Sequence, residues 1–267
     1  MLEYHNNWWE SVPARRTRII PVLLLSNGGF VKTTCFKDPV YLGDPFNIVK
    51  IFNEKEVDEI LILDINASSE SKTPKFDFLA EIAGECFMPL AYGGGVKSID
   101  DISRLTGLGY EKVCINTTAI QYPSLIEEAA KRFGSSTIMV AIDVKKNLFG
   151  KYDIYTQNGK NKKGLDPIRQ AKLYESLGAG ELLVNSIDRD GTMEGYDLKM
   201  IKQLSSAVSI PVVACGGAGN TRHLADGVQK AGASAVSAGS MFVFQGKLRG
   251  VLITMPTEKE LLEANIP

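Results

Sequence analysis

The amino-acid sequence predicts one α/β domain that folds as a (β/α)8 TIM barrel made of two similar half-barrels. Eight short aliphatic runs alternate with segments of helical period. The length of 267 residues suits such a barrel, which typically needs about 250. The second half of the chain also repeats the pattern of the first. We therefore expect an N-terminal extension over residues 1–17 and the barrel over residues 18–267.

Most of the strand candidates are nearly continuously apolar, as parallel strands buried on both faces are. They are RIIPVLL from Arg18, EILILDI from Glu59, FMPLAY from Phe87, KVCIN from Lys112, TIMVAID from Thr137, ELLVNSI from Glu181, IPVVAC from Ile210 and SAVSAG from Ser234. Their number favours a closed barrel. An open, doubly wound sheet is the alternative.

Between these strand candidates, capping residues or helical periodicity predict three helices. Ser98 is a candidate N-cap with Asp101 in the capping-box position, and Asp197 is a candidate cap for residues 197–207. Residues 123–132 form another helical segment. The long stretches 26–43 and 145–163 each follow the first strand of a half, and we expect them to be irregular loops that act as lids.

Composition narrows the possible partners. The net charge of −1 gives no indication of nucleic acid or an anionic membrane surface. No apolar run approaches the roughly 20 residues of a membrane span, and the first 14 residues lack the apolar core of a signal peptide. Four cysteines without a C-x-x-C motif favour reduced thiols and a cytoplasmic location; they are Cys35, Cys86, Cys114 and Cys215.

Histidines are scarce, which bears on metals and cofactors. His5 lies in the extension and His223 at the start of a helix, and neither belongs to a cluster with cysteines or carboxylates. The sequence therefore predicts no metal and no cofactor. Trp8 and Trp9 lie in the extension, where they either pack on the barrel or a partner or remain part of a partly ordered segment.

Two glycine-rich strand ends predict two anion sites. Active sites of TIM barrels lie at the carboxyl ends of the strands, and glycine lets backbone N–H groups approach an anion closely. The first predicted site combines Gly94 and Gly95 with Asn116 and Thr117, and the second combines Gly217 with Gly239 and Ser240. Neither is a P-loop or a dinucleotide fingerprint. A single glycine pair could equally form a tight turn, but two copies at matching positions favour anion binding.

The carboxylates at this end differ between the halves. Asp143 ends the first strand of the second half, where a carboxylate can act as a general acid or base. The matching position in the first half is Leu24, and a leucine cannot move a proton. Asp64 is either a second acid or a structural acceptor, and Asp190 with Gly191 could order a loop that faces a phosphate.

Four charged residues begin strands at the opposite end, namely Arg18, Glu59, Lys112 and Glu181. Such a set forms either a stabilising ion-pair layer or a polar ring around an axial opening for a small neutral molecule. Spacing alone leaves both interpretations open.

The motifs RIIP, VKT, LGDP, GGGV, INT, AID, GAGE, SIDRDGT and GGAG run in register through residues 18–244 and resemble the HisF-type cyclase subunit of imidazole glycerol phosphate synthase. The resemblance implies a (β/α)8 barrel. In that family ammonia enters along the barrel axis from a glutaminase (HisH-type) on the bottom face. A ribulosyl substrate with two phosphates is then cyclised at the top face.

The resemblance also implies roles for residues. Its phosphate-binding positions fall on Gly94, Gly95, Asn116, Thr117, Asp190, Gly191, Gly217, Gly239 and Ser240, with a loop lysine at Lys32. One of its two catalytic aspartates falls on Asp143. Its charged ammonia gate falls on Arg18, Glu59, Lys112 and Glu181.

Two departures lie at the substrate end: the other catalytic aspartate is Leu24, and a threonine is replaced by Asn185. The stretches RIIPVLLLSNGGFVKT and FNEKEVDEI resemble a sister group, the WbuZ-like barrels associated with amidation of N-acetyl sugars in surface polysaccharide (lipopolysaccharide) synthesis. There the barrel pairs with a glutaminase and passes ammonia to a separate sugar amidotransferase.

Four hypotheses follow. The first is a subunit that supplies ammonia for sugar amidation and has lost cyclisation. The second is a working cyclase of histidine biosynthesis. The third is a scaffold that only activates a glutaminase. The fourth is the related aminoaldose isomerase barrel, against which Leu24 counts because that chemistry also uses carboxylates in both halves.

Overall fold

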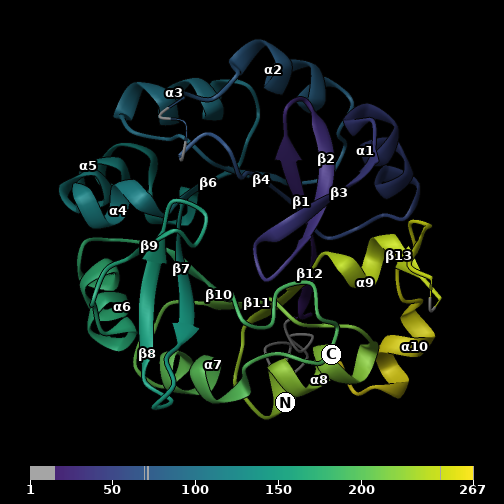
Figure 1. The fold of residues 1–267 in the computed structure, drawn as a ribbon. Coiled ribbons are helices and arrows are strands. Elements are labelled where there is room, and N and C mark those ends of the chain that lie inside the picture. The colour runs from purple at the N-terminus through teal and green to yellow at the C-terminus, as the bar shows by residue number, and fades with distance from the viewer. Residues whose placement is uncertain (1–15, 69, 71, 247, 267) are drawn as a thin grey trace, which may run out of the picture.

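Eight parallel strands close into a barrel in the computed structural model, which describes residues 16–266 except 69, 71 and 247. Figure 1 looks along its axis. The strands are β1 (Arg18–Ser26), β4 (Ile60–Asp64), β5 (Leu90–Gly93), β6 (Lys112–Ile115), β7 (Ile138–Lys146), β10 (Glu181–Ser186), β11 (Val212–Cys215) and β12 (Ala235–Ala238). Pairing of β12 with β1 and of β7 with β10 closes the circle, so the predicted TIM barrel is confirmed and an open sheet is excluded.

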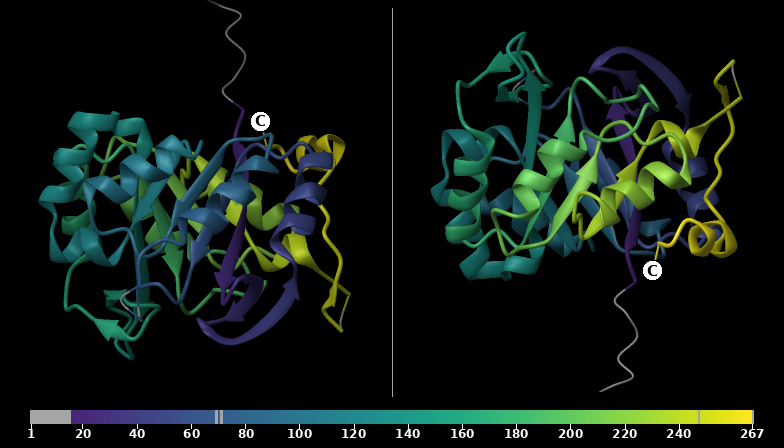
Figure 2. Two further views of the ribbon diagram at one scale, coloured as in Figure 1. Left: turned by 90° about the horizontal axis from the view of Figure 1, so that it is seen from above. Right: turned by 90° about the horizontal axis from the view of Figure 1, so that it is seen from below.

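Helices form the outer ring (Figures 1 and 2). They are α1 (Pro45–Glu54), α2 (Phe76–Gly84), α3 (Ile99–Gly107), α4 (Thr117–Gln121), α5 (Ser124–Phe133), α6 (Pro167–Ser176), α7 (Leu198–Ser205), α8 (Thr221–Gln229), α9 (Ser240–Val243) and α10 (Glu258–Glu263), with a 3-10 turn at Ser135–Thr137. The predicted caps are confirmed. Ser98 and Asp101 form a reciprocal capping box, and the Asp197 carboxylate accepts a hydrogen bond from the Met200 amide.

Two apolar layers hold the barrel together. One lies between strands and helices and includes Phe52, Ile60 and Leu79. The other fills the barrel interior and includes Ile20 and Met139. Because side chains fill the interior, the barrel is a packed core at mid-height, and the charged side chains of its strands lie toward its two ends.

The two stretches expected to be irregular are instead hairpins, so that expectation was wrong. β2 (Gly29–Thr34) pairs with the end of β1 and with β3 (Lys37–Gly43), while β8 (Tyr152–Thr156) pairs with the end of β7 and with β9 (Asn161–Lys162). The overlooked signal is Asn27-Gly28, whose positive φ values of 51° and 85° suit a tight hairpin turn. Antiparallel pairing gives these projecting segments the backbone hydrogen bonds that irregular loops would lack.

The strand register relates the two halves residue by residue. Leu24 of β1 lies beside Leu63 of β4, and Asp143 of β7 lies beside Asn185 of β10. Leu24 and Asp143 therefore occupy equivalent positions, as the repeat predicts. Residues 1–15, which hold His5, Trp8 and Trp9 and most of the predicted extension, lie outside the described part of the chain.

Candidate functional site at the carboxyl ends of the strands

A pocket opens where the strands end, and the residues predicted from sequence converge on it. Its lining includes Leu24, Lys32, Gly94, Gly95, Asn116, Thr117, Asp143, Asp190, Gly191, Gly217, Gly239 and Ser240. The hairpin β2–β3 closes over part of it. The Thr33 hydroxyl donates to the Asp190 carboxylate at 2.9 Å, and the Cys35 amide donates to the Asp190 carbonyl at 2.8 Å.

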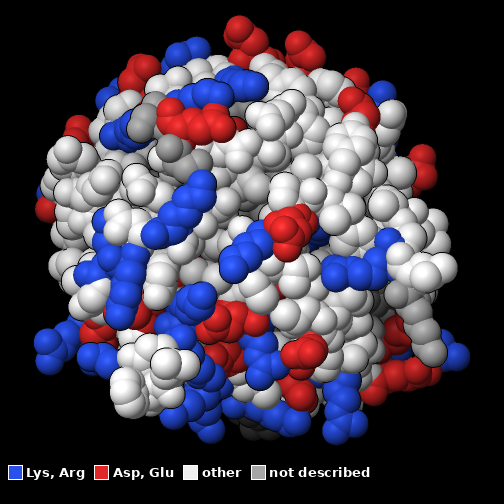
Figure 3. Space-filling view, in the orientation of Figure 1, with Lys and Arg blue, Asp and Glu red and all other residues white. Residues whose placement is uncertain are grey.

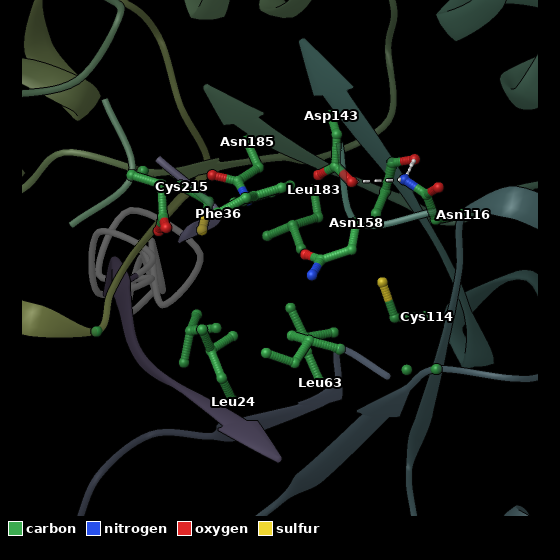
Figure 4. Close-up of a pocket in the computed structure, with 18 of the residues that line it drawn as sticks. Leu24, Phe36, Leu63, Cys114, Asn116, Asp143, Asn158, Leu183, Asn185 and Cys215 are labelled. Carbon is green, nitrogen blue, oxygen red and sulfur yellow. Dashed lines mark hydrogen bonds between the residues drawn. The ribbon is translucent and has the colours of Figure 1, made fainter. Parts of the chain in front are cut away.

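Asp143 is the carboxylate at the base of this pocket. The Asn116 side-chain amide donates to its Oδ2 at 3.1 Å (Figure 4). Desolvation raises the pKa of Asp143 to about 7, and the nearby Asp190 charge adds to the rise. Hydrogen bonds from Asn185 and Asn116 act in the opposite direction because they favour the charged form. A carboxyl group that titrates near neutral pH can both give and take a proton.

The wall across the pocket from Asp143 is apolar. Figure 4 shows Leu24 and Leu63 on the side opposite Asp143 and Asn185. Leu24 packs in the interior apolar cluster, with Leu63 against it. Asp64 is the one acid of the amino-terminal half among the described lining residues. Its Oδ1 accepts hydrogen bonds from the amides of Asn66 and Ala67, so it holds a turn.

The first glycine-rich site needs its glycines. Gly94 and Gly95 have φ values of 123° and 70°. A Cβ on Gly94 would lie 2.6 Å from the Asp64 carbonyl oxygen, which is backbone and cannot move aside. The Thr117 hydroxyl closes the site and accepts a hydrogen bond from the Gln157 amide at 3.3 Å.

The second site contains a buried lysine. A Cβ on Gly239 would lie 2.0 Å from the Lys32 Nζ, so the absence of a side chain there makes room for the ammonium group. Lys32 is only 4% exposed, and no carboxylate in the described part of the chain pairs with it. Because an unpaired buried cation is costly, this site favours an anion. Gly217 and Gly191 complete the turns, with φ values of 116° and 72°.

The four charges at the other end form one closed ring. Arg18 pairs with Glu59 and with Glu181. The Lys112 Nζ lies 2.8 Å from a Glu59 oxygen and 2.9 Å from a Glu181 oxygen. Both glutamates are almost fully buried, and the Glu59 Oε1 has no partner. The four ion pairs thus form a cycle with two charges of each sign, at the end of the barrel opposite the pocket.

Other candidate groups have structural surroundings. His223 accepts a hydrogen bond from the Gly219 amide through Nδ1 and so holds a turn. Over the described residues, no group of three or more His, Cys, Asp or Glu side chains could hold a metal. No helix in the same part of the chain is both long and apolar enough to cross a bilayer. All four cysteines are free.

Sequence reasoning missed Leu63 as part of the pocket wall. The signal was present, because Leu63 takes the position in the first half that Asn185 takes in the second. The sequence also gave no indication that the Asn116 side chain would donate a hydrogen bond to Asp143, since that contact depends on the pairing of β6 with β7.

Fold and pocket together define a two-fold (β/α)8 barrel with paired glycine-rich turns and the buried carboxyl group of Asp143 between them. Residues 18–249 match the sequence family described as "Histidine biosynthesis protein". The chain therefore belongs to this family, on its HisF-type branch.

Its relatives carry matching names and nearly the same length. It is 46% identical over 246 residues to the "Putative imidazole glycerol phosphate synthase subunit hisF2" of Pseudomonas aeruginosa, covering 92% of this chain and 98% of the relative. It is 45% identical to the Leptospira interrogans protein "Putative imidazole glycerol phosphate synthase subunit HisF", covering 92% and 97%. The "hisF3" protein of Vibrio vulnificus is 45% identical, with 93% and 96% covered.

Proposed function

We propose that this chain is the barrel subunit of a glutamine-dependent amidotransferase complex, which receives ammonia from a glutaminase and passes it on for sugar amidation. In this proposal the cyclisation of a two-phosphate ribulosyl substrate has been lost. The observation that carries it is Leu24, a hydrocarbon side chain that faces Asp143 across the pocket.

The argument rests on proton transfer. Ring closure with two acid–base groups needs an oxygen or nitrogen on each side of the reacting centre. Here Leu24 and Leu63 provide neither, and Asp64 is bound to two backbone amides. Losing one such group typically costs about 10²–10⁴-fold in rate, which is enough to remove a useful activity.

The ring of charged residues at the opposite end of the barrel supports the proposed transfer of ammonia. Arg18, Glu59, Lys112 and Glu181 are all present and paired. A balanced ring can part to admit a small neutral molecule such as ammonia without leaving a net charge in the barrel. The partner proposed for this face is a HisH-type glutaminase, and the names of the relatives describe subunits of a synthase. A sugar amidotransferase would receive the ammonia.

The first experiment supplies ammonium and the two-phosphate ribulosyl substrate to the purified chain. We expect turnover at least 100-fold below that of a HisF-type enzyme assayed beside it. Turnover at the normal rate would disprove the loss of cyclisation.

The second experiment tests ammonia transfer in the complex with its glutaminase and the sugar acceptor enzyme. Glu181→Gln should reduce the amidated sugar formed per glutamine hydrolysed, because it opens the ring. Lys230→Met, which removes a surface charge just after α8, is the control and should leave this ratio unchanged. Equal ratios for the two variants would favour a scaffold that only activates the glutaminase.

A working cyclase of histidine biosynthesis is the second candidate. Asp143, with a pKa of about 7, and both glycine-rich sites favour it. This candidate requires that Leu24→Asp leave the cyclisation rate almost unchanged.

A further inference from the structure

The turn between β7 and β8 exposes two large apolar side chains. Leu148 is fully exposed and Phe149 is 94% exposed. The turn itself does not require them, because Asn147 Oδ1 accepts hydrogen bonds from the amides of Phe149 and Lys151, and Gly150 takes the positive φ of 75°. Polar residues are usual in such turns. Two adjacent apolar side chains in water therefore have no role within the fold, and such exposed apolar groups are typical of interaction sites.

The hairpin that carries this turn is strongly basic. Residues 145–163 contain six lysines and one acid, Asp153, although the net charge of the whole chain is −1. No ion pair in the described part of the chain includes four of these lysines, namely Lys145, Lys151, Lys160 and Lys163. Figure 3 looks onto the mouth of the pocket and shows lysine and arginine side chains gathered over β8 and β9. The apolar turn thus has a positively charged surround.

The base of this hairpin is fixed to the barrel. The Tyr152 hydroxyl donates to the Asp197 carboxylate, with distances of 2.7 and 2.9 Å to its two oxygens. The Lys146 Nζ lies 2.9 Å from Asp197 Oδ2, and the Lys146 amide donates to Asp188 Oδ2 at 2.9 Å. A turn that projects from a fixed base loses little conformational freedom when it is bound, which favours binding.

The far end of the same hairpin borders the pocket. Asn158, in the turn between β8 and β9, is one of the lining residues. The neighbouring Gln157 amide donates to the Thr117 hydroxyl at 3.3 Å. A molecule bound to this hairpin would therefore lie at the mouth of the pocket.

A second exposed turn lies on the other side of the mouth. β13 (Phe244–Gln245) and β14 (Gly250–Val251) pair with each other, and Leu248 in the turn between them is 97% exposed. Arg249 connects this turn to the pocket, because its Nη2 lies 3.4 Å from the hydroxyl of Ser240, a lining residue. Figure 2 shows both hairpins projecting beyond the barrel at the same end and on opposite sides. A protein that contacts both turns covers the mouth.

We infer that these two turns form a docking surface for the enzyme that accepts the ammonia, a protein with an apolar groove and an acidic rim. The inference rests on the proposed function. Ammonia released into water at neutral pH becomes ammonium, which is not a nucleophile, so transfer between two enzymes needs a covered mouth. The apolar groove would bind Leu148 and Phe149, and the acidic rim would face the lysines of the hairpin.

Two other occupants fit less well. A second copy of this chain, docked by the same face, would bring two basic hairpins together, and like charges repel. An anionic lipid bilayer would attract the lysines, but it could not accept ammonia. Both remain outcomes that the experiment separates.

Biolayer interferometry between the chain in complex with its glutaminase and the sugar-amidating acceptor enzyme tests the surface. The double variant Leu148→Ser, Phe149→Ser should weaken binding at least about 30-fold, as loss of a central apolar contact does. Leu262→Ser removes an exposed apolar side chain from α10 and should leave binding unchanged. Lys151→Glu should slow association and reduce its dependence on salt, whereas Lys259→Glu on α10 should do neither.

Three results would overturn the docking surface. They are unchanged binding in the double variant, a dimer of the natural chain that the double variant loses in sedimentation velocity, and binding of the natural chain alone to vesicles of phosphatidylglycerol and phosphatidylcholine. We expect a monomeric chain that leaves the vesicles free.

Amidation from glutamine separates this inference from the proposed function. In the mixture of all three proteins, the double variant should form less amidated sugar from glutamine and the same amount from added ammonium. Equal amidation from glutamine by the natural chain and the double variant would reject the surface and keep the proposed function. Binding of the acceptor without any amidation from glutamine would do the reverse.

Discussion

The two halves of the barrel have the same backbone at the pocket but different side chains, which are apolar in the first half and polar in the second. Leu24 and Leu63 occupy in the first half the positions that Asp143 and Asn185 occupy in the second. The strand register is the same, so fold does not account for the difference. At these register positions only the second half carries a group that can move a proton, so function here must be argued from side chains.

At the opposite end of the barrel, the charged residues of the ring are distributed unequally between the two halves. Each half contributes one glutamate to the ring, Glu59 and Glu181, and both cations come from the first half. By register, Thr137 and Ala235 take the positions of Arg18 and Lys112 in the second half. Charge balance is thus achieved across the whole ring and not within each half.

The largest expected effect comes from restoring the missing acid. Leu24→Asp places a carboxylate opposite Asp143, in the position that the register makes equivalent. We expect cyclisation of the two-phosphate ribulosyl substrate with ammonium to rise about 10²–10⁴-fold, the usual contribution of one acid–base group. Product formation measured under saturating substrate checks this.

Leu24→Asn is the matched control because it has the same size as aspartate and cannot exchange the proton. It should give less than a tenth of the gain. If the two variants are equally active, a polar side chain at position 24 is sufficient, and the contrast between the halves is one of hydrogen bonding alone.

The amino-acid sequence predicted the barrel and the difference between Leu24 and Asp143, because its periodicity and internal repeat bring these two residues into register. The sequence could not predict that Lys32 reaches Gly239, because that contact depends on the hairpin β2–β3 folding over the pocket. Arg249 was missed for the same reason, since it approaches Ser240 only once the C-terminal hairpin is in place.

The ring supplies the next largest effect, on stability. Glu181 binds Arg18 through one oxygen and Lys112 through the other, whereas Glu59 binds both cations through Oε2. Glu181→Gln should therefore lower the free energy of unfolding by about 2–4 kcal/mol, below the full cost of breaking a fully buried pair because the cations are partly exposed. Glu59→Gln should cost less. Urea unfolding measures both.

A surface ion pair at the C-terminal end of α8 gives the scale for that measurement. Lys230→Met breaks its 2.8 Å contact with Asp226 and should change the free energy of unfolding by no more than about 0.5 kcal/mol. If Glu59→Gln lowers the free energy of unfolding more than Glu181→Gln does, the number of carboxylate oxygens that bind the two cations does not determine the loss of stability.

The carboxyl group of the second half makes stability depend on pH. The pKa of Asp143 is raised from 3.8 to about 7 by desolvation. Between these values the folded chain binds more protons than the unfolded chain, so its stability falls as pH rises. Asp143→Asn should be about 1–3 kcal/mol more stable than the natural chain at pH 8 and equally stable near pH 3. Exposed Glu128→Gln on α5 should shift stability by under about 0.5 kcal/mol at both pH values.

The smallest effect concerns the neighbour of that carboxyl group. Asn185→Leu makes the second half resemble the first, where Leu63 has this position. Because the Asn185 hydrogen bond favours the charged form of Asp143, its loss should raise the pKa of Asp143 above about 7, by roughly one unit or less. Carbon-13 NMR titration of the Asp143 carboxyl group measures the shift. Leu63→Asn is the matched control and should not move it, since Figure 4 places Leu63 on the opposite wall. A fall in the Asp143 pKa in Asn185→Leu would contradict this prediction. It would mean that the Asn185 side chain raises the Asp143 pKa by desolvation more than its hydrogen bond lowers it.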